Sequence, residues 1–325
     1  MKILITGVSG YIGSCLYLYL NKKFRICGVD KVNTELLKVK NCNLLNFNKL
    51  NKLLKKEKPD LIIHLAAQSL VDETIHKKKY NLNNIVATKN LVRAMKKNNL
   101  NNLIFSSTAA VYKYKNKALK ESSSISPKST YASTKLKCEK IIKNSKINSI
   151  ILRFFNVCSS LKIKNRIIGE LHNPETHLIP TLVYKNLSKQ KIYIYGNNYK
   201  TKDGTCVRDY IHIKDVCIAI EKSIYFLNKH ENSFQIINIG SSSKKTNLEI
   251  INKIKKLTKL ESKFQFVKRR KGDVDFLMCS INKAKKILNW KPSNSNINNI
   301  IKNEIEWVNY LFKKKRLRKF KNYLK

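Results

Sequence analysis

The sequence is poor in the residues and runs that mark fibrous, disordered or membrane-spanning chains. Its 325 residues include only nine glycines and five prolines, which excludes a collagen-like or Pro/Gly-rich disordered chain. No apolar run approaches the roughly 18 residues of a membrane span, so we expect no membrane partner. The apolar start is interrupted by glycines and continues into a motif, so we expect no signal peptide. A chain of this length with 42% hydrophobic residues can bury a substantial core by itself.

Acidic residues are also scarce, with 21 Asp and Glu against 66 Lys and Arg and a net charge of +45. Such an excess is typical of proteins that bind nucleic acid or anionic surfaces, and it would attract an anionic small substrate. The lysines are spread along the whole chain, however, and Lys, Asn and Ile are over-used together, as an AT-rich genome would produce. Because charge alone carries no groove-reading motif, we expect no specific nucleic-acid partner. A solvated, frayed helix end is expected for the basic tail, residues 313–325.

Metal and disulfide patterns are missing as well. The eight cysteines form no CxxC pair, and the six histidines show no metal-ligand spacing with Cys or Asp. We therefore expect reduced, mostly buried thiols, a cytoplasmic location and no metal site. The cysteines are Cys15, Cys27, Cys42, Cys138, Cys158, Cys206, Cys217 and Cys279.

The first half of the sequence alternates short apolar runs with longer amphipathic stretches. Near-continuous apolar strands separated by helices are typical of a parallel sheet with helices on both faces. Right-handed crossovers then give a doubly wound layer, so we predict a Rossmann-type α/β fold. The predicted strands span residues 2–6, 25–30, 61–67, 102–107 and 149–154. The predicted helices span residues 11–22, 46–57, 80–98 and 130–147.

A glycine-rich turn joins the first predicted strand to the first helix. GVSGYIG places Gly7, Gly10 and Gly13 where a tight turn would aim helix N-terminal amides at a pyrophosphate. Asp30 ends the next strand, where a carboxylate accepts from a ribose 2′-hydroxyl and repels a 2′-phosphate. The alternative is an ordinary turn with an N-capping Asp. The context favours dinucleotide binding, and NAD over NADP.

A second motif, YASTK, carries proton-transfer chemistry. Tyr131 and Lys135 lie four residues apart on a predicted helix and so share one face, where Lys⁺ would stabilise the phenolate and lower its pKa. Thr108 directly follows a strand, at the sheet edge where ligands bind. Alone, a Tyr/Lys pair is more often a helix-surface pair, but beside a dinucleotide site it indicates hydride transfer. Asn84 is predicted to give polar support or to cap a helix.

The pattern changes after about residue 157, where helices mix with isolated strands. We predict that residues 1–157 form the NAD-binding domain, with a segment near 213–240 returning to it. Residues 158–325 are predicted to form a smaller mixed α/β substrate-binding domain, interleaved with the first. The elements predicted after residue 157 span residues 178–190, 191–196, 207–212, 214–228, 235–240, 246–259, 264–267, 282–289 and 297–312, of which 214–228 and 235–240 belong to the returning segment.

Together these motifs resemble the extended short-chain dehydrogenase/reductase family. The general motifs are GVSGYIG, HLAA (64–67), FSSTAAVY (105–112) and YASTK. More specific ones are LRFFN (152–156), HNPETHLIP (172–180), DGTCVRDYIH (203–212), RRKGD (269–273) and KILNWKP (286–292). The resemblance runs from about residue 1 to 312 and is to the branch that epimerises UDP-hexoses at carbon 4 through a 4-keto intermediate.

The resemblance implies roles at matching positions. Thr108, Tyr131 and Lys135 would be catalytic, with Tyr131 as acid/base and Thr108 assisting the substrate hydroxyl. NAD would be held by Gly7, Gly10, Tyr11, Ile12, Gly13, Asp30, Asn43, Asn84, Tyr131, Lys135 and Phe155. The UDP-sugar would be held by Thr108, Asn156, Arg208, Arg270 and Asp273. Guanidinium forks suit phosphate oxygens, although a surface salt bridge is the alternative for Arg208. The resemblance also implies a homodimer.

Three positions depart from the family pattern. Asn43 stands where an Asp is common beside the adenine, and an amide can still accept a hydrogen bond. Ser69 replaces a Lys of some epimerases, which removes a cofactor contact and leans toward sugar-nucleotide dehydratases. Leu277 occupies a position whose bulk is associated with accepting or excluding N-acetylated sugars, and its intermediate size leaves both open.

The alternative functions predict different features of the sequence or of the protein's binding. A sugar-nucleotide 4,6-dehydratase needs an Asp-Glu pair directly after the Ser/Thr, where this chain has Ala109 and Ala110. A sugar-nucleotide decarboxylase lacks support from the HNPETH segment. A basic nucleic-acid-binding module on an enzyme fold is the remote alternative, and it would show polynucleotide affinity that falls steeply with salt.

Overall fold

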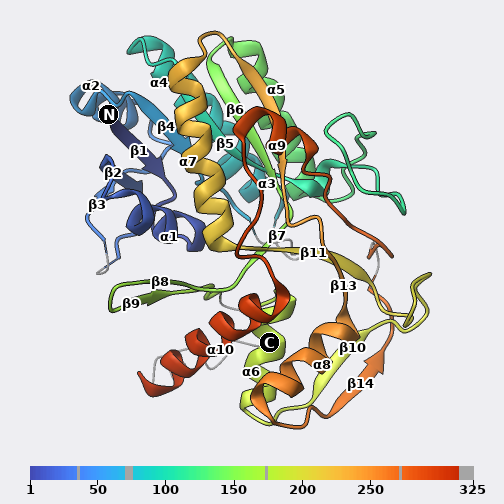
Figure 1. Cartoon of the computed structure of the whole chain (residues 1–325). Coiled ribbons are helices and arrows are strands. Elements are labelled where there is room, and N and C mark those ends of the chain that lie inside the picture. Colours follow the sequence, from blue (N-terminus) through green and yellow to red (C-terminus); the bar gives the residue numbers. More distant parts are fainter. Residues whose placement is uncertain (35–36, 70–75, 173–174, 271–272, 315–325) are drawn as a thin grey trace.

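The computed structural model describes the chain except residues 35–36, 70–75, 173–174, 271–272 and 315–325 (Figure 1). The last described helix, α10 (Ile297–Lys313), ends where the basic tail begins. The frayed helix end expected for the tail therefore lies almost wholly outside the described residues.

A seven-stranded parallel sheet forms the larger part of the molecule. Its strands are β1 (Lys2–Thr6), β2 (Arg25–Asp30), β3 (Val39–Asn41), β4 (Leu61–His64), β5 (Asn102–Thr108), β6 (Asn148–Phe154) and β12 (Phe234–Ile239). Their order across the sheet is β3-β2-β1-β4-β5-β6-β12, which confirms the predicted doubly wound fold. Because β12 pairs with β6, the chain returns to this sheet long after it first leaves it.

The strands send alternate side chains into two separate hydrophobic layers. In β1, Ile3 and Ile5 belong to one core cluster, whereas Leu4 between them belongs to the other. The helices of the first layer are α1 (Tyr11–Leu20) and α7 (Ile213–Lys229), and those of the second are α2 (Phe47–Glu57), α4 (Ala87–Lys97) and α5 (Thr130–Ser145). Both faces are covered, which explains why the strands are near-continuous apolar runs in the sequence.

The helix predicted over residues 80–98 is interrupted. α3 (Lys77–Tyr80) continues into a π-helical turn at Asn81–Val86, and only then does α4 begin. Such π turns are rare and are frequent at functional sites. The turn contains Asn84, which is therefore inside a helical segment and not at a helix N-cap.

A smaller layer lies beyond the carboxyl ends of the sheet strands, at the bottom of Figure 1. Its helices are α6 (Leu178–Leu187), α8 (Asn247–Thr258) and α10, and they share a third hydrophobic cluster. Its strands are β10 (Ile192–Tyr195) and β14 (Phe264–Val267), which pair in parallel. These elements all lie close to their predicted ranges.

Short strands join the two layers, and the sequence did not predict most of them. β7 (Asn156–Cys158), β11 (Val207–His212) and β13 (Lys244–Thr246) form one sheet, and β8 (Leu161–Ile163) pairs with β9 (Arg166–Ile168). β3, β7, β8, β9 and β13 have three residues each, too few for an alternating pattern to show. A further helix, α9 (Asn282–Leu288), belongs to the part of the molecule built on the seven-stranded sheet and packs against α7 and β12.

None of the helices in the described part of the chain combines the length and the apolar character needed to cross a membrane.

Candidate active site

A cavity of about 1060 Å³ lies at the carboxyl ends of the central strands, facing the smaller layer. This sheet edge is where doubly wound folds bind ligands. The predicted site residues that line it are Gly7, Gly10, Tyr11, Ile12, Gly13, Asp30, Asn43, Thr108, Tyr131, Lys135, Phe155, Asn156, Arg208, Arg270 and Asp273. Asn84 is the one predicted site residue that does not form part of the wall.

The glycine loop folds tightly under the N-terminus of α1. Gly7 has a φ of +76°, and a Cβ there would lie 2.5 Å from the backbone nitrogen of Ala66. A Cβ on Gly13 would lie 2.1 Å from the carbonyl oxygen of Gly7. Side chains at these positions would therefore break the loop. The first turn of α1 holds no acidic residue, so its free amides favour an anionic group.

Asp30 fixes this loop as well as lining the cavity. Its Oδ2 accepts a hydrogen bond from the Ser9 amide at 3.0 Å, and its Oδ1 accepts from the Val32 amide at 3.2 Å. Each oxygen keeps a second lone pair for a ribose hydroxyl. Asn43 lies on the same wall, where its Oδ1 accepts from the Leu45 amide at 3.0 Å.

Thr108 and Tyr131 meet on the wall next to the glycine loop. Thr108 is the last residue of β5, and its Oγ1 accepts a hydrogen bond from the Ala110 amide at 3.1 Å, which caps a short 3₁₀ turn. Tyr131 lies in the first turn of α5, which Ser129 caps by accepting from the Ala132 amide at 3.1 Å. Both side chains are thus held by local caps that the sequence itself encodes.

Lys135 lies one helical turn further along α5 and is buried, with 2% of its surface exposed. Its Nζ lies 4.4 Å from the centre of the Phe105 ring. Among the described residues no carboxylate forms an ion pair with it, because the nearby Glu139 is paired with Arg153 at 2.6 Å. Burial lowers the pKa of Lys135 to about 8, although the charge of Glu139 acts in the opposite direction. Its ammonium is therefore available to a ligand or to Tyr131.

The acidity of Tyr131 differs from the sequence-based expectation. Burial raises its pKa to about 12, and the hydrogen bond with Thr108 only partly offsets this. The lowering expected from Lys135 is wrong, because the cost of removing the phenolate from water dominates this pKa and the hydrogen bond with Thr108 is the opposing effect. A phenolate would need more positive charge than the protein alone supplies.

Asn84 lies behind the cavity wall and supports it through hydrogen bonds. It is 2% exposed, and its Oδ1 accepts from the Gln68 amide at 2.7 Å while its Nδ2 donates to Thr134 Oγ1 at 2.9 Å. Thr134 lies directly before Lys135 on α5. The amide thus ties the segment after β4 to the helix that carries Tyr131 and Lys135.

The segment that follows β6 supplies a further part of the wall. Phe155 donates its amide to the carbonyl of Ile239 at 3.0 Å, and Asn156 Nδ2 donates to the carbonyl of Asp209 at 2.7 Å. Phe155 is buried, with 6% of its surface exposed. These bonds connect the sheet to β11, which carries Arg208.

Arg208 and Asp273 contact each other on another part of the cavity wall. Arg208 Nη1 donates to the Val274 carbonyl at 2.7 Å, and its Nη2 lies 3.4 Å from Asp273 Oδ1. Asp273 Oδ2 also accepts from the Tyr199 hydroxyl at 3.2 Å, a contact the sequence analysis did not foresee. The salt bridge offered as the alternative role of Arg208 exists, but it lies on the cavity wall and leaves the guanidinium facing a ligand space.

Arg270 is an exposed cation at the same end. Its guanidinium carbon lies 3.8 Å from the centre of the Tyr195 ring, on β10. The two arginines therefore approach from different segments, with Arg208 on a strand and Arg270 in a loop. Tyr195 and Tyr199 are two contributors that no sequence motif marked.

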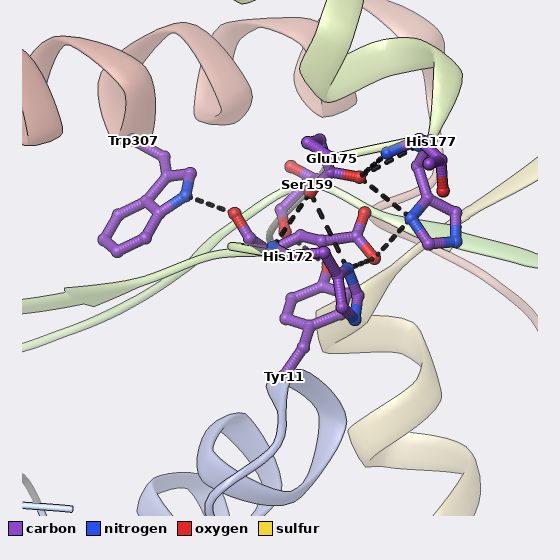
Figure 2. Close-up of polar contacts among 8 residues, drawn as sticks. Tyr11, Ser159, His172, Glu175, His177 and Trp307 are labelled. Carbon is purple, nitrogen blue, oxygen red and sulfur yellow. Dashed lines mark hydrogen bonds and ion pairs between the residues drawn. The ribbon is translucent and has the colours of Figure 1, made fainter. Parts of the chain in front are cut away.

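A cluster that no sequence motif predicted consists of Glu170, His172, Glu175 and His177 (Figure 2). His172 and His177 line the cavity, and so does Glu170. The neighbouring carboxylates raise the pKa of both histidines against the opposing effect of burial, for His172 to about 10. The metal-ligand patterns considered in the sequence pair His with Cys or Asp. The partners of these histidines are instead glutamates, inside the HNPETH segment or just before it.

A doubly wound sheet, a glycine loop beneath a helix N-terminus and a Tyr/Lys pair beside a strand-end Thr define the short-chain dehydrogenase/reductase class of proteins. Residues 3–240 match the family model described as the NAD dependent epimerase/dehydratase family, and the chain belongs to that family.

Individual relatives cover nearly the whole chain. A UDP-glucose 4-epimerase of Lactobacillus helveticus is 34% identical over 322 residues, which cover 94% of this chain and 97% of that protein. The crystal structure of UDP-glucose 4-epimerase from Brucella ovis in complex with NAD is 27% identical, with a TM-score of 0.88 over 94% of this chain and 98% of that one. A UDP-glucose-4-epimerase from Stenotrophomonas maltophila, solved with bound NAD and formylated UDP-arabinopyranose, is 25% identical, with a TM-score of 0.91 over 97% and 99%.

Proposed function

We propose that this chain catalyses the NAD-dependent, reversible epimerisation of a UDP-hexose at carbon 4, with UDP-glucose and UDP-galactose as its substrates. The observation that carries the proposal is one cavity with Thr108, Tyr131 and Lys135 at one end and Arg208 and Arg270 at the other. The relatives from Lactobacillus helveticus and Brucella ovis, with their named activity, support the same reaction.

The glycine loop, the first turn of α1 and Asp30 fit NAD. The tight Gly7 and Gly13 turn and the free amides of α1 suit its pyrophosphate, and Asp30 suits a ribose hydroxyl. When bound, NAD supplies the acceptor and later the donor for the hydrogen on carbon 4. Tyr131 would ionise more readily beside the positive nicotinamide, which favours the phenolate.

At the reacting end, Tyr131 takes the proton of the 4-hydroxyl and later returns it to the other face of the same carbon. Thr108 holds that hydroxyl through its own Oγ1, which the Ala110 amide orients. Lys135 stabilises the phenolate form of Tyr131 because its ammonium has no ion-pair partner among the described residues. No carboxylate takes part in these steps.

At the anchoring end, Arg208 and Arg270 bind the diphosphate, and Asp273 faces the uridine ribose. These contacts lie away from carbon 4, so they hold the 4-keto sugar while the hexose turns about its phosphate linkage. Asn156 contributes a side chain between the two ends. Leu277, which is 9% exposed, also lines the cavity and would border the position of an N-acetyl group.

The rival dehydratase reaction has no support at this site. Elimination of water from carbons 5 and 6 needs an extra acid/base pair beside Thr108, and the wall there consists of Ala109 and Ala110. The acidic side chains that line the cavity in the described part of the chain are Asp30, Glu170 and Asp273, each bound to other groups.

The proposal is tested by incubating the purified chain and NAD with UDP-galactose, UDP-glucose and both N-acetylated forms. Analysis of the products by NMR should show inversion at carbon 4 without water loss and without net consumption of NAD. The matched control is Tyr131→Phe prepared in the same way. Loss of water or carbon dioxide from the sugar, or no conversion of any of the four, would overturn the proposal.

We propose in addition that the chain acts as a homodimer in the cytoplasm, as the family resemblance implies. All eight cysteines are buried and unpaired, which suits a reducing compartment. Light scattering of the purified chain measures its mass in solution, and a strictly monomeric active enzyme would contradict the dimer.

A further inference from the structure

Four ionisable side chains come together where the segment after β9 reaches α6. Glu170 and His172 lie at one side, and Glu175 and His177 lie just before the helix. Residues 173 and 174, between them, lie outside the described residues, but all four side chains are described. One ligand atom from each lies within 4.8 Å of the ligand atoms of the others. Figure 2 shows the carboxylates and the imidazoles converging on one small volume.

The distances form a closed ring around that volume. His172 Nδ1 lies 3.2 Å from Glu170 Oε1 and 3.6 Å from Glu175 Oε2. His177 Nδ1 lies 3.1 Å from Glu170 Oε1 and 3.0 Å from Glu175 Oε1. Metal–ligand bonds near 2.05 Å in a tetrahedron give neighbouring ligand atoms a separation of about 3.3 Å. The four N···O contacts are close to that separation, and the remaining pairs of ligand atoms lie within 4.8 Å.

Two buried atoms of these four side chains lack the hydrogen bonds that such atoms normally have. Glu170 is 3% exposed, yet its Oε2 has no hydrogen-bond partner among the described residues. His172 Nδ1 also lacks one, although Glu170 Oε1 is close, because the two groups are not aligned for an N–H···O bond. Groups that point at a common centre instead of at each other leave this signature.

Hydrogen bonds from neighbouring segments support the backbone at and near Glu170. Trp307 on α10 donates its indole N–H to the Glu170 carbonyl at 2.8 Å, and its ring takes the space that a side chain on Gly169 would fill. On the other side, the Tyr11 hydroxyl donates to the Ser159 carbonyl. Both contacts are drawn in Figure 2. Support of this kind is what a preformed ligand set needs.

A further buried carboxylate lies in the same region as the cluster. Glu304 on α10 is fully buried, and neither of its carboxylate oxygens has a partner among the described residues. Glu170 and Glu175, each 3% exposed, share this buried region.

We propose that Glu170, His172, Glu175 and His177 form a binding site for one divalent cation of the zinc type. Two imidazoles with two carboxylates suit zinc, whereas calcium and magnesium prefer oxygen ligands alone. His177 is free for this role because it precedes α6 without using its side chain as a cap. The site joins the smaller layer to the glycine-loop side of the cavity, and it goes beyond the proposed epimerisation, which needs no metal.

The experiment measures zinc bound to the full chain after EDTA treatment, reloading and dialysis. The wild-type chain should retain one Zn²⁺ per chain by mass spectrometry of the metal. In the Glu170→Gln/His172→Gln variant we expect at least a ~100-fold weaker affinity, because half of the ligand set is lost. His76→Gln, on an exposed histidine outside the cluster, is the matched control and should keep the ion.

A second readout does not depend on how well the variant folds. Co²⁺ loaded into the EDTA-treated wild-type chain should give the visible absorption of a tetrahedral complex with nitrogen and oxygen ligands. Zn²⁺ should also raise the wild-type melting temperature more than that of the double variant. Substoichiometric zinc in the wild type, or equal zinc retention by the double variant and the wild type, would overturn the proposal. Neither result bears on epimerisation, so the two proposals fail separately.

Discussion

The cations at the two ends of the cavity differ in their burial and in their partners. At the reacting end, Lys135 is buried without an ion-pair partner among the described residues, and its pKa falls to about 8. At the anchoring end, Arg208 is bound to Asp273, and Arg270 is exposed over the Tyr195 ring. In the proposed mechanism, burial adjusts proton affinity at the first end, whereas charge and fixed direction bind phosphate at the second. The same kind of residue, a cation, thus serves two purposes according to its surroundings.

The comparison predicts that mutations at the reacting end slow turnover, whereas those at the anchoring end weaken binding. Tyr131→Phe removes the oxygen that we propose to exchange a proton with the sugar. We expect kcat to fall by ~10³-fold or more, with UDP-sugar affinity retained by calorimetry. Turnover at the wild-type rate would show that another group is the acid/base.

The buried cation at the reacting end should cost stability. The pKa of Lys135 is lowered from 10.5 to about 8, so the folded chain releases a proton more easily than the unfolded chain. At pH values below both pKa values the charged form destabilises the fold by up to ~3 kcal/mol, and this cost disappears as pH rises from about 8 to 10.5. Lys135→Met should therefore be more stable than the wild type at neutral pH but nearly inactive.

Lys137→Met, on an exposed position two residues further along α5, is the control for Lys135→Met and should change stability by less than ~0.5 kcal/mol. Chemical denaturation at several pH values measures both variants. If Lys135→Met were destabilised at neutral pH, or its gain did not shrink above about pH 8, the assigned burial cost would be incorrect.

At the anchoring end the effect should appear in KM. Arg208→Ala removes a guanidinium held at 2.7 Å by the Val274 carbonyl and facing the cavity. We expect kcat/KM to fall by ~10²-fold, mostly through KM, with Arg208→Lys intermediate because it keeps the charge but loses the fork. An unchanged KM with a reduced kcat would show that Arg208 acts in turnover and not in substrate binding.

The smallest expected effect concerns Thr108. Thr108→Val keeps the shape but removes the hydroxyl that contacts Tyr131, and kcat should fall by ~10-fold to 100-fold. Thr108→Ser should retain most activity. Equal rates for the Val and Ser variants would show that the hydroxyl has no part in the reaction.

The sequence predicted best what depends on neighbours in the chain. The glycine loop, Asp30 at a strand end and the Tyr131/Lys135 spacing are local patterns, and the structure brings them to one wall. The doubly wound parallel sheet follows from the apolar runs and from right-handed crossovers. Asn84 lies behind the wall because a π turn, which no simple periodicity reveals, interrupts its helix.

The remaining features depend on contacts between distant segments. The raised pKa of Tyr131 follows from how deeply tertiary packing buries it, which spacing along a helix does not report. Tyr199 reaches Asp273 across 74 positions of the sequence. The cluster around Glu170 and His177 also needs Trp307 and Tyr11 in place, although its Glu and His residues were visible in the sequence.

The most direct test of the epimerisation follows the hydrogen on carbon 4. UDP-galactose labelled with deuterium at that carbon is converted by the wild-type chain in ordinary water, and the product is examined by NMR. The account predicts UDP-glucose that keeps the deuterium on carbon 4, because Tyr131 exchanges only the proton on oxygen. Product without the label would contradict it, since the hydrogen on carbon would then have passed to solvent.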